Sequence, residues 1–93
     1  MADVAGEDED PRVAGLQRAV SRLRRELAAY RGDFAERHIA EDELAALHAM
    51  TLGGAVEARR LRRSLLVVAG ALGSVSALSR ALGEVRGAVD AFG

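Results

Sequence analysis

The sequence predicts an all-α protein, a small antiparallel bundle of about four helices. Apolar residues recur three or four positions apart along most of the chain, which is the period of one helix face. No stretch alternates with the period of two that is typical of a strand, and Ala, Leu, Arg and Glu dominate the composition. A chain of 93 residues has room for one domain, so these helices should pack into a single bundle.

The first helix is expected at residues 11–31, after a short acidic segment. Residues 1–9 (MADVAGEDE) have no apolar period, so we expect a disordered acidic tail that precedes a single helical domain over residues 10–93. Asp10 can accept hydrogen bonds from the first free N–H groups of a helix, and Pro11 suits the first helical position. The apolar residues that follow form an unbroken heptad pattern: Val13, Leu16, Val20, Leu23, Leu27, Tyr30 and Phe34.

The second helix is expected at residues 36–51. Gly32 interrupts the helix-forming residues, and Asp33 and Glu36 have the spacing of a capping box, while Gly53 and Gly54 should end the helix. Its apolar stripe is Ile39, Leu44, Leu47 and Met50, and its solvated residues are Glu36, Arg37, Glu41, Asp42 and Glu43.

The third and fourth helices are expected at residues 55–71 and 74–92. Their apolar residues are Leu61, Leu65, Val68, Leu72 and Val75, then Leu78, Leu82, Val85, Val89 and Phe92. The spacing slips beside Gly70, Gly73 and Ser74, so the two helices either fuse into one kinked rod or break, with Ser74 as a new N-cap. The break is the favoured alternative.

The small supply of large apolar residues suggests self-association. Only 27 residues are apolar and larger than Ala, which is few for four helix faces in one chain. We therefore expect a homodimer or higher oligomer. The expected interface residues are Val13, Leu16, Val20, Leu23, Leu27, Leu65, Val68, Leu72, Val75 and Leu78.

Residues 64–79 form a stretch without charge between Arg63 and Arg80. A membrane-spanning helix needs about 20 predominantly apolar residues, and this stretch is shorter and holds four Ser residues. A buried helix is therefore the favoured interpretation, and membrane association through residues 64–79 is the alternative.

Two clusters of Arg residues are candidate anion contacts: Arg18, Arg22 and Arg25 on the first helix, and Arg59, Arg60, Arg62 and Arg63 on the third. They could bind nucleic acid, a nucleotide or a lipid surface. A net charge of −1 and the lack of aromatic residues among them argue against nucleic acid. The favoured interpretation is a solvated face that pairs with Glu26, Glu57 and the acidic tail. Thirteen Arg residues and no Lys indicate a GC-rich coding bias, which lowers the weight of any Arg cluster.

No catalytic, cofactor or metal site is expected. His38 and His48 are the only histidines, and His38 with Glu41 and Asp42 makes too small a ligand set for a metal ion. The Ser residues have no nearby His or Lys base, and phosphate-binding glycine motifs are missing from the sequence. The chain holds no Cys and begins without a signal peptide, so we expect a cytoplasmic protein.

Three blocks of sequence, at residues 10–30, 40–47 and 61–82, together with the closing VDAFG, resemble a family of small actinobacterial, largely streptomycete, proteins of unknown function. AGALGSVSAL at residues 69–78 is the most specific of these motifs. The resemblance covers residues 10–93 and implies an actinobacterial origin, but no activity and no functional residues. We therefore expect a non-enzymatic helical module for protein interaction or oligomerisation. Binding of an anionic ligand by the Arg clusters is the alternative.

Overall fold

The computed structural model describes residues 10–53 and 56–93, and these form a bundle of four α-helices. The helices are α2 (Pro11–Ala29), α3 (Arg37–Gly53), α4 (Ala58–Leu72) and α5 (Ser79–Asp90), and a short 3-10 helix, η1 (Ser76–Leu78), precedes α5. The predicted fold class is confirmed. The expected acidic tail at residues 1–9 lies outside the described residues.

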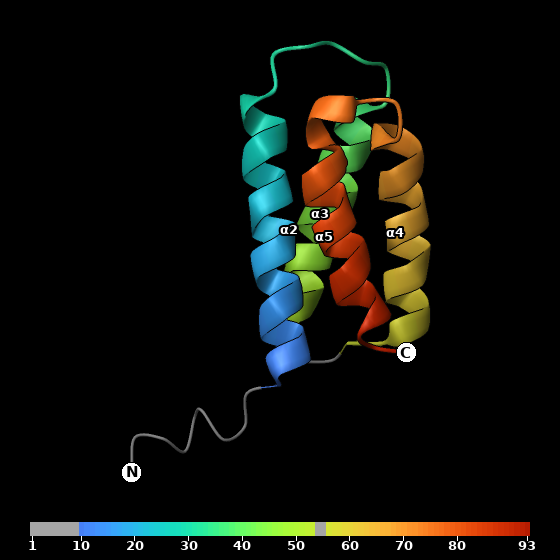
Figure 1. The fold of residues 1–93 in the computed structure, drawn as a ribbon. Coiled ribbons are helices and arrows are strands. Elements are labelled where there is room, and N and C mark those ends of the chain that lie inside the picture. The colour runs from blue at the N-terminus through green and yellow to red at the C-terminus, as the bar shows by residue number, and fades with distance from the viewer. Residues whose placement is uncertain (1–9, 54–55) are drawn as a thin grey trace.

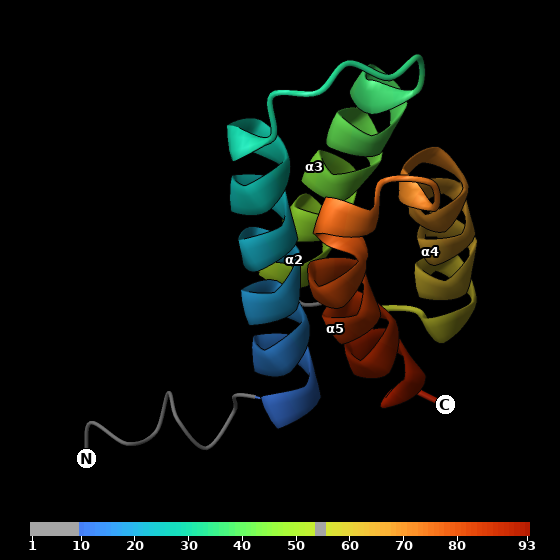
Figure 2. The same ribbon diagram turned by 45° about the horizontal axis from the view of Figure 1, so that its top comes forward.

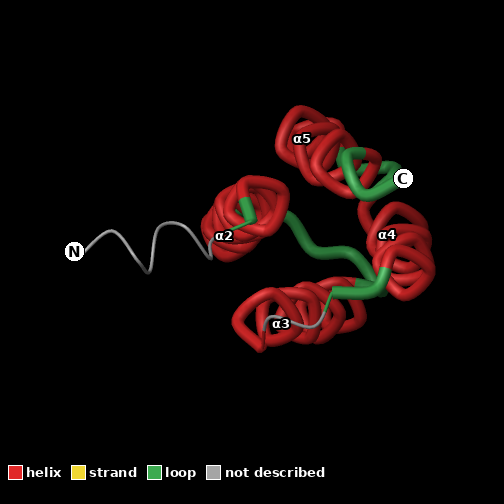
Figure 3. The backbone as a smooth tube through the Cα atoms, turned by 90° about the horizontal axis from the view of Figure 1, so that it is seen from below, coloured by secondary structure: helices red, strands yellow, loops and turns green. Residues whose placement is uncertain are grey.

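Successive helices run in opposite directions, so the bundle has up-down-up-down topology (Figures 1 and 2). The bundle seen along its axis in Figure 3 places the four helices at the corners of a ring. Helix α2 packs against α3 and α5, and α4 packs against the same two helices, which leaves α2 and α4 at opposite corners. The N-termini of α2 and α4 therefore lie at the same end of the bundle.

Helix α2 begins where the sequence predicts. The side chain of Asp10 accepts a hydrogen bond from the backbone N–H of Arg12 at 2.9 Å, and Pro11 occupies the first turn. The helix ends at Ala29, two residues before the expected end, because the N–H of Tyr30 bonds to the carbonyl of Leu27 and the backbone becomes extended.

The side chain of Arg37 closes the connection between α2 and α3. Its guanidinium donates to the backbone carbonyls of Leu27, Tyr30 (2.8 Å) and Gly32 (3.0 Å), and its Nε forms an ion pair with Glu41 at 3.2 Å. Arg side chains often donate to carbonyl groups at the C-terminus of a helix, and Arg37 does so at Leu27 and at two residues just beyond the end of α2. The prediction that Arg37 is a solvated residue is therefore wrong: its side chain is half-buried.

The capping box predicted for the second helix does not begin α3. Asp33 lies four residues before the first helical residue, Arg37, whereas an N-cap residue adjoins it. Instead, the N–H groups of Arg37 and Ala40 bond to the carbonyls of Phe34 and Glu36.

Helices α4 and α5 are separate, so the favoured break is confirmed and the fused rod is wrong. The chain leaves α4 at Leu72, turns, and enters η1 with Val75 as its N-cap residue, so Ser74 is not the cap that we expected. The hydroxyl of Ser79 donates to the carbonyl of Ser76 at 2.9 Å and links η1 to the first turn of α5.

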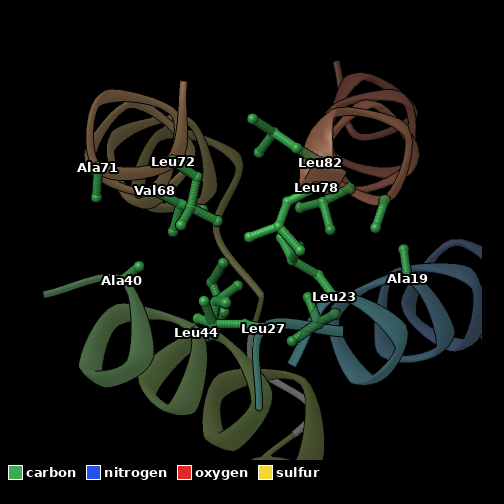
Figure 4. Close-up of a cluster of buried hydrophobic side chains, with 14 of the residues drawn as sticks. Ala19, Leu23, Leu27, Ala40, Leu44, Val68, Ala71, Leu72, Leu78 and Leu82 are labelled. Carbon is green, nitrogen blue, oxygen red and sulfur yellow. The ribbon is translucent and has the colours of Figure 1, made fainter. Parts of the chain in front are cut away.

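The core lies along the axis of the ring, where side chains of all four helices meet (Figure 4). Most of the predicted apolar positions point into it. Ile39 does not, since its side chain is 42% exposed, and the small residues Ala40 and Thr51 take part in the buried face of α3 instead. The buried hydrophobic residues are Leu16, Ala19, Val20, Leu23, Leu27, Ala40, Leu44, Leu47, Leu61, Val68, Ala71, Leu72, Val75, Leu78, Ala81, Leu82, Val85 and Val89.

Candidate interaction surface

The residues expected at an oligomer interface lie inside the bundle of one chain. Val13 and Leu65 are partly buried, and the other eight are buried in the core: Leu16, Val20, Leu23, Leu27, Val68, Leu72, Val75 and Leu78. A second copy could reach these eight only if the bundle opened. The core of one chain covers them, so the shortage of apolar residues does not itself require a partner copy.

The Arg cluster on α2 is partly neutralised by carboxylates. Arg22 forms ion pairs with Glu26 on the same helix, at 2.9 Å, and with Glu84 on α5, at 2.8 Å. The hydrogen bond that Arg22 donates to Glu26 and the charge of Glu84 raise the pKa of Arg22. Its predicted pairing with Glu26 is thus confirmed. Arg18 and Arg25 remain exposed beside a shallow recess of about 690 Å³ that Glu84 also lines.

The Arg cluster on α4 occupies the first two turns of the helix. Arg59, Arg60 and Arg63 line a recess of about 450 Å³ together with Glu43, Glu57 and Ser64. In residues 10–53 and 56–93, no ion pair joins any of these three Arg side chains to a carboxylate, which includes the expected partner Glu57. The fourth, Arg62, donates to the carbonyl of Gly93 at 3.0 Å and so holds the C-terminal turn against α4.

One carboxylate of this recess is already engaged. The hydroxyl of Ser64, which is buried, donates to Glu43 at 2.6 Å and ties α4 to α3. The prediction that Glu43 is a solvated residue is therefore wrong. The missed signal is Ser64 itself, a polar residue at a core position of α4 that needs a partner from a neighbouring helix.

The next turn of α4 exposes large apolar side chains on the outside of the bundle. Leu66 is 73% exposed and Val67 is 37% exposed, while Val68 is buried. The sequence offered a signal for this, because Leu65, Leu66, Val67 and Val68 are consecutive and one face of a helix cannot bury four consecutive residues. The outer face of α4 is therefore basic in its first two turns and apolar in the next.

The described residues offer neither a metal site nor a membrane-spanning helix. Among them, no three His, Asp or Glu side chains gather closely enough to hold a metal ion, so His38, Glu41 and Asp42 do not form a metal site. The uncharged stretch 64–79 is divided among the second half of α4, a turn, η1 and the first residue of α5. None of the helices in the described part of the chain is long and apolar enough to cross a membrane.

The fold and this surface define a class, the small up-and-down four-helix bundle with a basic and apolar outer face on α4. The chain belongs to a family of unknown function (DUF5955), whose model matches residues 5–93. No curated protein and no solved structure matches the chain. The expected membership of a family without known activity is confirmed. The match begins at residue 5 rather than residue 10, so it includes part of the acidic segment.

Proposed function

We propose that this chain is a non-enzymatic interaction module that binds an acidic protein partner through the outer face of α4. One observation carries the proposal: Arg59, Arg60 and Arg63 occupy the first two turns, and the next turn exposes Leu66 and Val67. We call these five residues the α4 face.

The chemistry of the α4 face fits a partner that carries carboxylates beside apolar side chains. Arg pairs with carboxylates in a bidentate geometry, and buried apolar contacts flanked by charged groups are typical of protein interfaces. Helix α4 has no acidic residue between Ala58 and Leu72, so no carboxylate of its own helix competes for these Arg side chains. A partner helix with acidic residues one or two turns, roughly 5–11 Å, from its apolar residues matches this spacing.

Small anions and nucleic acid fit the α4 face less well. A small anion would pair with the Arg side chains alone and would leave Leu66 and Val67 exposed. Binding to a phosphate polymer also depends mainly on charge and gives Leu66 and Val67 no part in the contact. A protein partner uses both parts of the face.

The proposal includes the self-association expected from the composition, but with different interface residues. The contact between copies would use exposed residues such as Leu66 and not the eight that the core covers. We propose that these contacts occur in the cytoplasm, which fits a chain without Cys. We also propose an actinobacterial cell, which fits a chain whose basic residues are all Arg and none Lys.

The test compares what the tagged full chain and three variants capture from lysate after chemical crosslinking and nuclease treatment. Leu66→Ser removes the apolar part of the α4 face, and the triple variant Arg59→Gln, Arg60→Gln, Arg63→Gln removes its charge. The matched control is Arg18→Gln with Arg25→Gln, which removes exposed charge from α2. Unfolding curves check each variant, and exposed substitutions should change stability by about 0.5 kcal/mol or less.

We expect a protein that the parent and the α2 control both capture and that both α4 variants lose. Captured material that disappears with nuclease contradicts a protein partner and supports a nucleic acid. Capture that all four proteins share equally refutes the α4 face as the binding surface. Capture of only the chain itself, lost in Leu66→Ser, identifies the partner as a second copy.

A further inference from the structure

We propose that the acidic N-terminal segment of this chain, residues 3–9, binds to Arg59, Arg60 and Arg63 of the same molecule. The contact itself is a property of the isolated chain. Its regulatory meaning rests on the proposed function, because the segment would cover the charged end of the α4 face and compete with an acidic partner.

The charges of the two elements are complementary. Asp3, Glu7, Asp8 and Glu9 give the segment four carboxylates and no cation. The three Arg side chains of α4 lie on a helix without acidic residues, and no carboxylate of the described ranges 10–53 and 56–93 forms an ion pair with them. Arg–carboxylate pairs are frequently bidentate, which adds geometric specificity to the attraction.

The segment joins the bundle at the end where α4 begins. Helices α2 and α4 run in the same direction, so the residue that follows the segment, Asp10, lies at the same end as the first turn of α4 (Figure 1). Contacts through the C-terminal turn connect these two places. The guanidinium of Arg12 lies 4.9 Å from the ring centre of Phe92, and the adjoining Gly93 accepts a hydrogen bond from Arg62.

The segment is long enough to reach the three Arg side chains. Axes of neighbouring packed helices lie roughly 8–10 Å apart, so opposite corners of a square ring are separated by about 11–14 Å. An extended chain spans about 3.3 Å per residue, which gives Glu7 a reach of about 10 Å from Asp10 and Asp3 a reach of about 23 Å. Long Arg side chains shorten the distance that the backbone must cover.

The second exposed cluster, on α2, offers a weaker site for the segment. Arg22 already pairs with Glu26 and Glu84, so α2 offers the segment only Arg18 and Arg25. Helix α4 offers it three Arg side chains. The family match adds an independent reason to treat the acidic residues as part of the domain, since it begins at residue 5 and therefore covers Glu7 to Glu9.

Tethering makes such a contact effective even when each ion pair is weak. A short covalent connection holds the two groups at an effective concentration of roughly millimolar. An acidic partner would bind after displacing the segment, so neutralising Glu7, Asp8 and Glu9 should strengthen partner binding.

The test uses the full chain and needs no partner. Because the sequence contains no Cys, Ala5→Cys provides a single attachment site for a nitroxide spin label. Paramagnetic broadening of backbone amide signals then reports which residues the segment approaches. We expect broadening of residues 58–64 at low salt, and its loss at ~1 M salt, where the Debye length falls to about 3 Å.

Variants in the labelled background assign the contact. Arg59→Gln with Arg60→Gln and Arg63→Gln should abolish the broadening on α4, while Arg18→Gln with Arg25→Gln should leave it unchanged. Broadening confined to the first turn of α2, or broadening of α4 that survives high salt and the triple variant, overturns the proposal. If the segment broadens α4 in this way but the α4 variants lose no captured protein, the self-contact holds and the proposed function fails.

Discussion

Replacing Arg37 by Ala should destabilise the bundle more than replacing an exposed Arg such as Arg18 or Arg25. The side chain of Arg37 donates to three backbone carbonyls, those of Leu27, Tyr30 and Gly32, at the point where α2 ends. Its guanidinium also lies 5.9 Å from the ring centre of Phe34. The substitution therefore removes a cap from one helix and a contact from the connection to the next.

The magnitude follows from the number and kind of these bonds. A hydrogen bond that involves a charged group contributes about 1.5–3 kcal/mol when it is protected from water. The three bonds share one cation and lie in a partly solvated connection, so water replaces some of them after the substitution. We expect a loss of about 2–3 kcal/mol in the free energy of unfolding, which for a domain of this size lowers the melting temperature by about 8–24 °C.

Urea unfolding followed by helical circular dichroism measures this difference. Arg31→Ala is the matched control, because it removes an exposed Arg from the same connection and should change stability by about 0.5 kcal/mol or less. Glu41→Gln should also cost little, since its ion pair with Arg37 is an exposed i,i+4 pair worth about 0.3–0.5 kcal/mol. A loss for Arg37→Ala that equals the loss for Arg31→Ala would refute the capping role.

Three further outcomes are expected. Gly83→Ala should stabilise the protein by about 0.5–1 kcal/mol in thermal unfolding, because an added Cβ meets nothing within 4 Å and Ala favours the helix; a destabilised variant would contradict this. Gly73→Leu should destabilise it by about 1–3 kcal/mol, because a Cβ there would lie 2.7 Å from the carbonyl oxygen of Ala69 and the backbone must shift; unchanged urea unfolding would show that it need not. Hydrogen bonds from Arg12 lower the pKa of Asp10, so its stabilising effect should be complete above the unfolded pKa of about 3.9 and disappear as pH falls through the lower folded value; an equal acid response of Asp10→Ala and the parent would argue against it.

Periodicity predicted the four helices because burial in this bundle follows the helical repeat closely. Leu16, Val20, Leu23 and Leu27 are spaced as an unbroken heptad, and all four are buried. Ile39 lies five residues before Leu44 and is exposed, whereas Ala40, four residues before Leu44, is buried. On α3 the small residue at the helical spacing therefore takes the core position, and the larger side chain of Ile39 lies outside it.

The same periodicity could not identify which chain covers an apolar face. An apolar stripe such as that of α2 can pack against neighbours in its own bundle or against a second copy. The pattern indicates that the face is buried, but not which chain buries it. In this structure α3 and α5 supply the cover. The apolar residues available for an external contact are those outside the helical repeat. Leu66 is one of them, because it is adjacent to core positions in the sequence but is itself exposed.

The two Arg clusters looked equivalent in the sequence and differ in the structure for a simple electrostatic reason. On α2, Arg22 has Glu26 one turn along the same helix and Glu84 on the adjoining helix, so two carboxylates neutralise the middle of the cluster. On α4, Glu43 of the adjoining helix lines the same recess and accepts a hydrogen bond from Ser64, but in the described residues it forms no ion pair with Arg59, Arg60 or Arg63. The fold therefore uses part of the basic charge of α2 internally and leaves that of α4 available, so we expect charge removal on α4, and not on α2, to change what the protein binds.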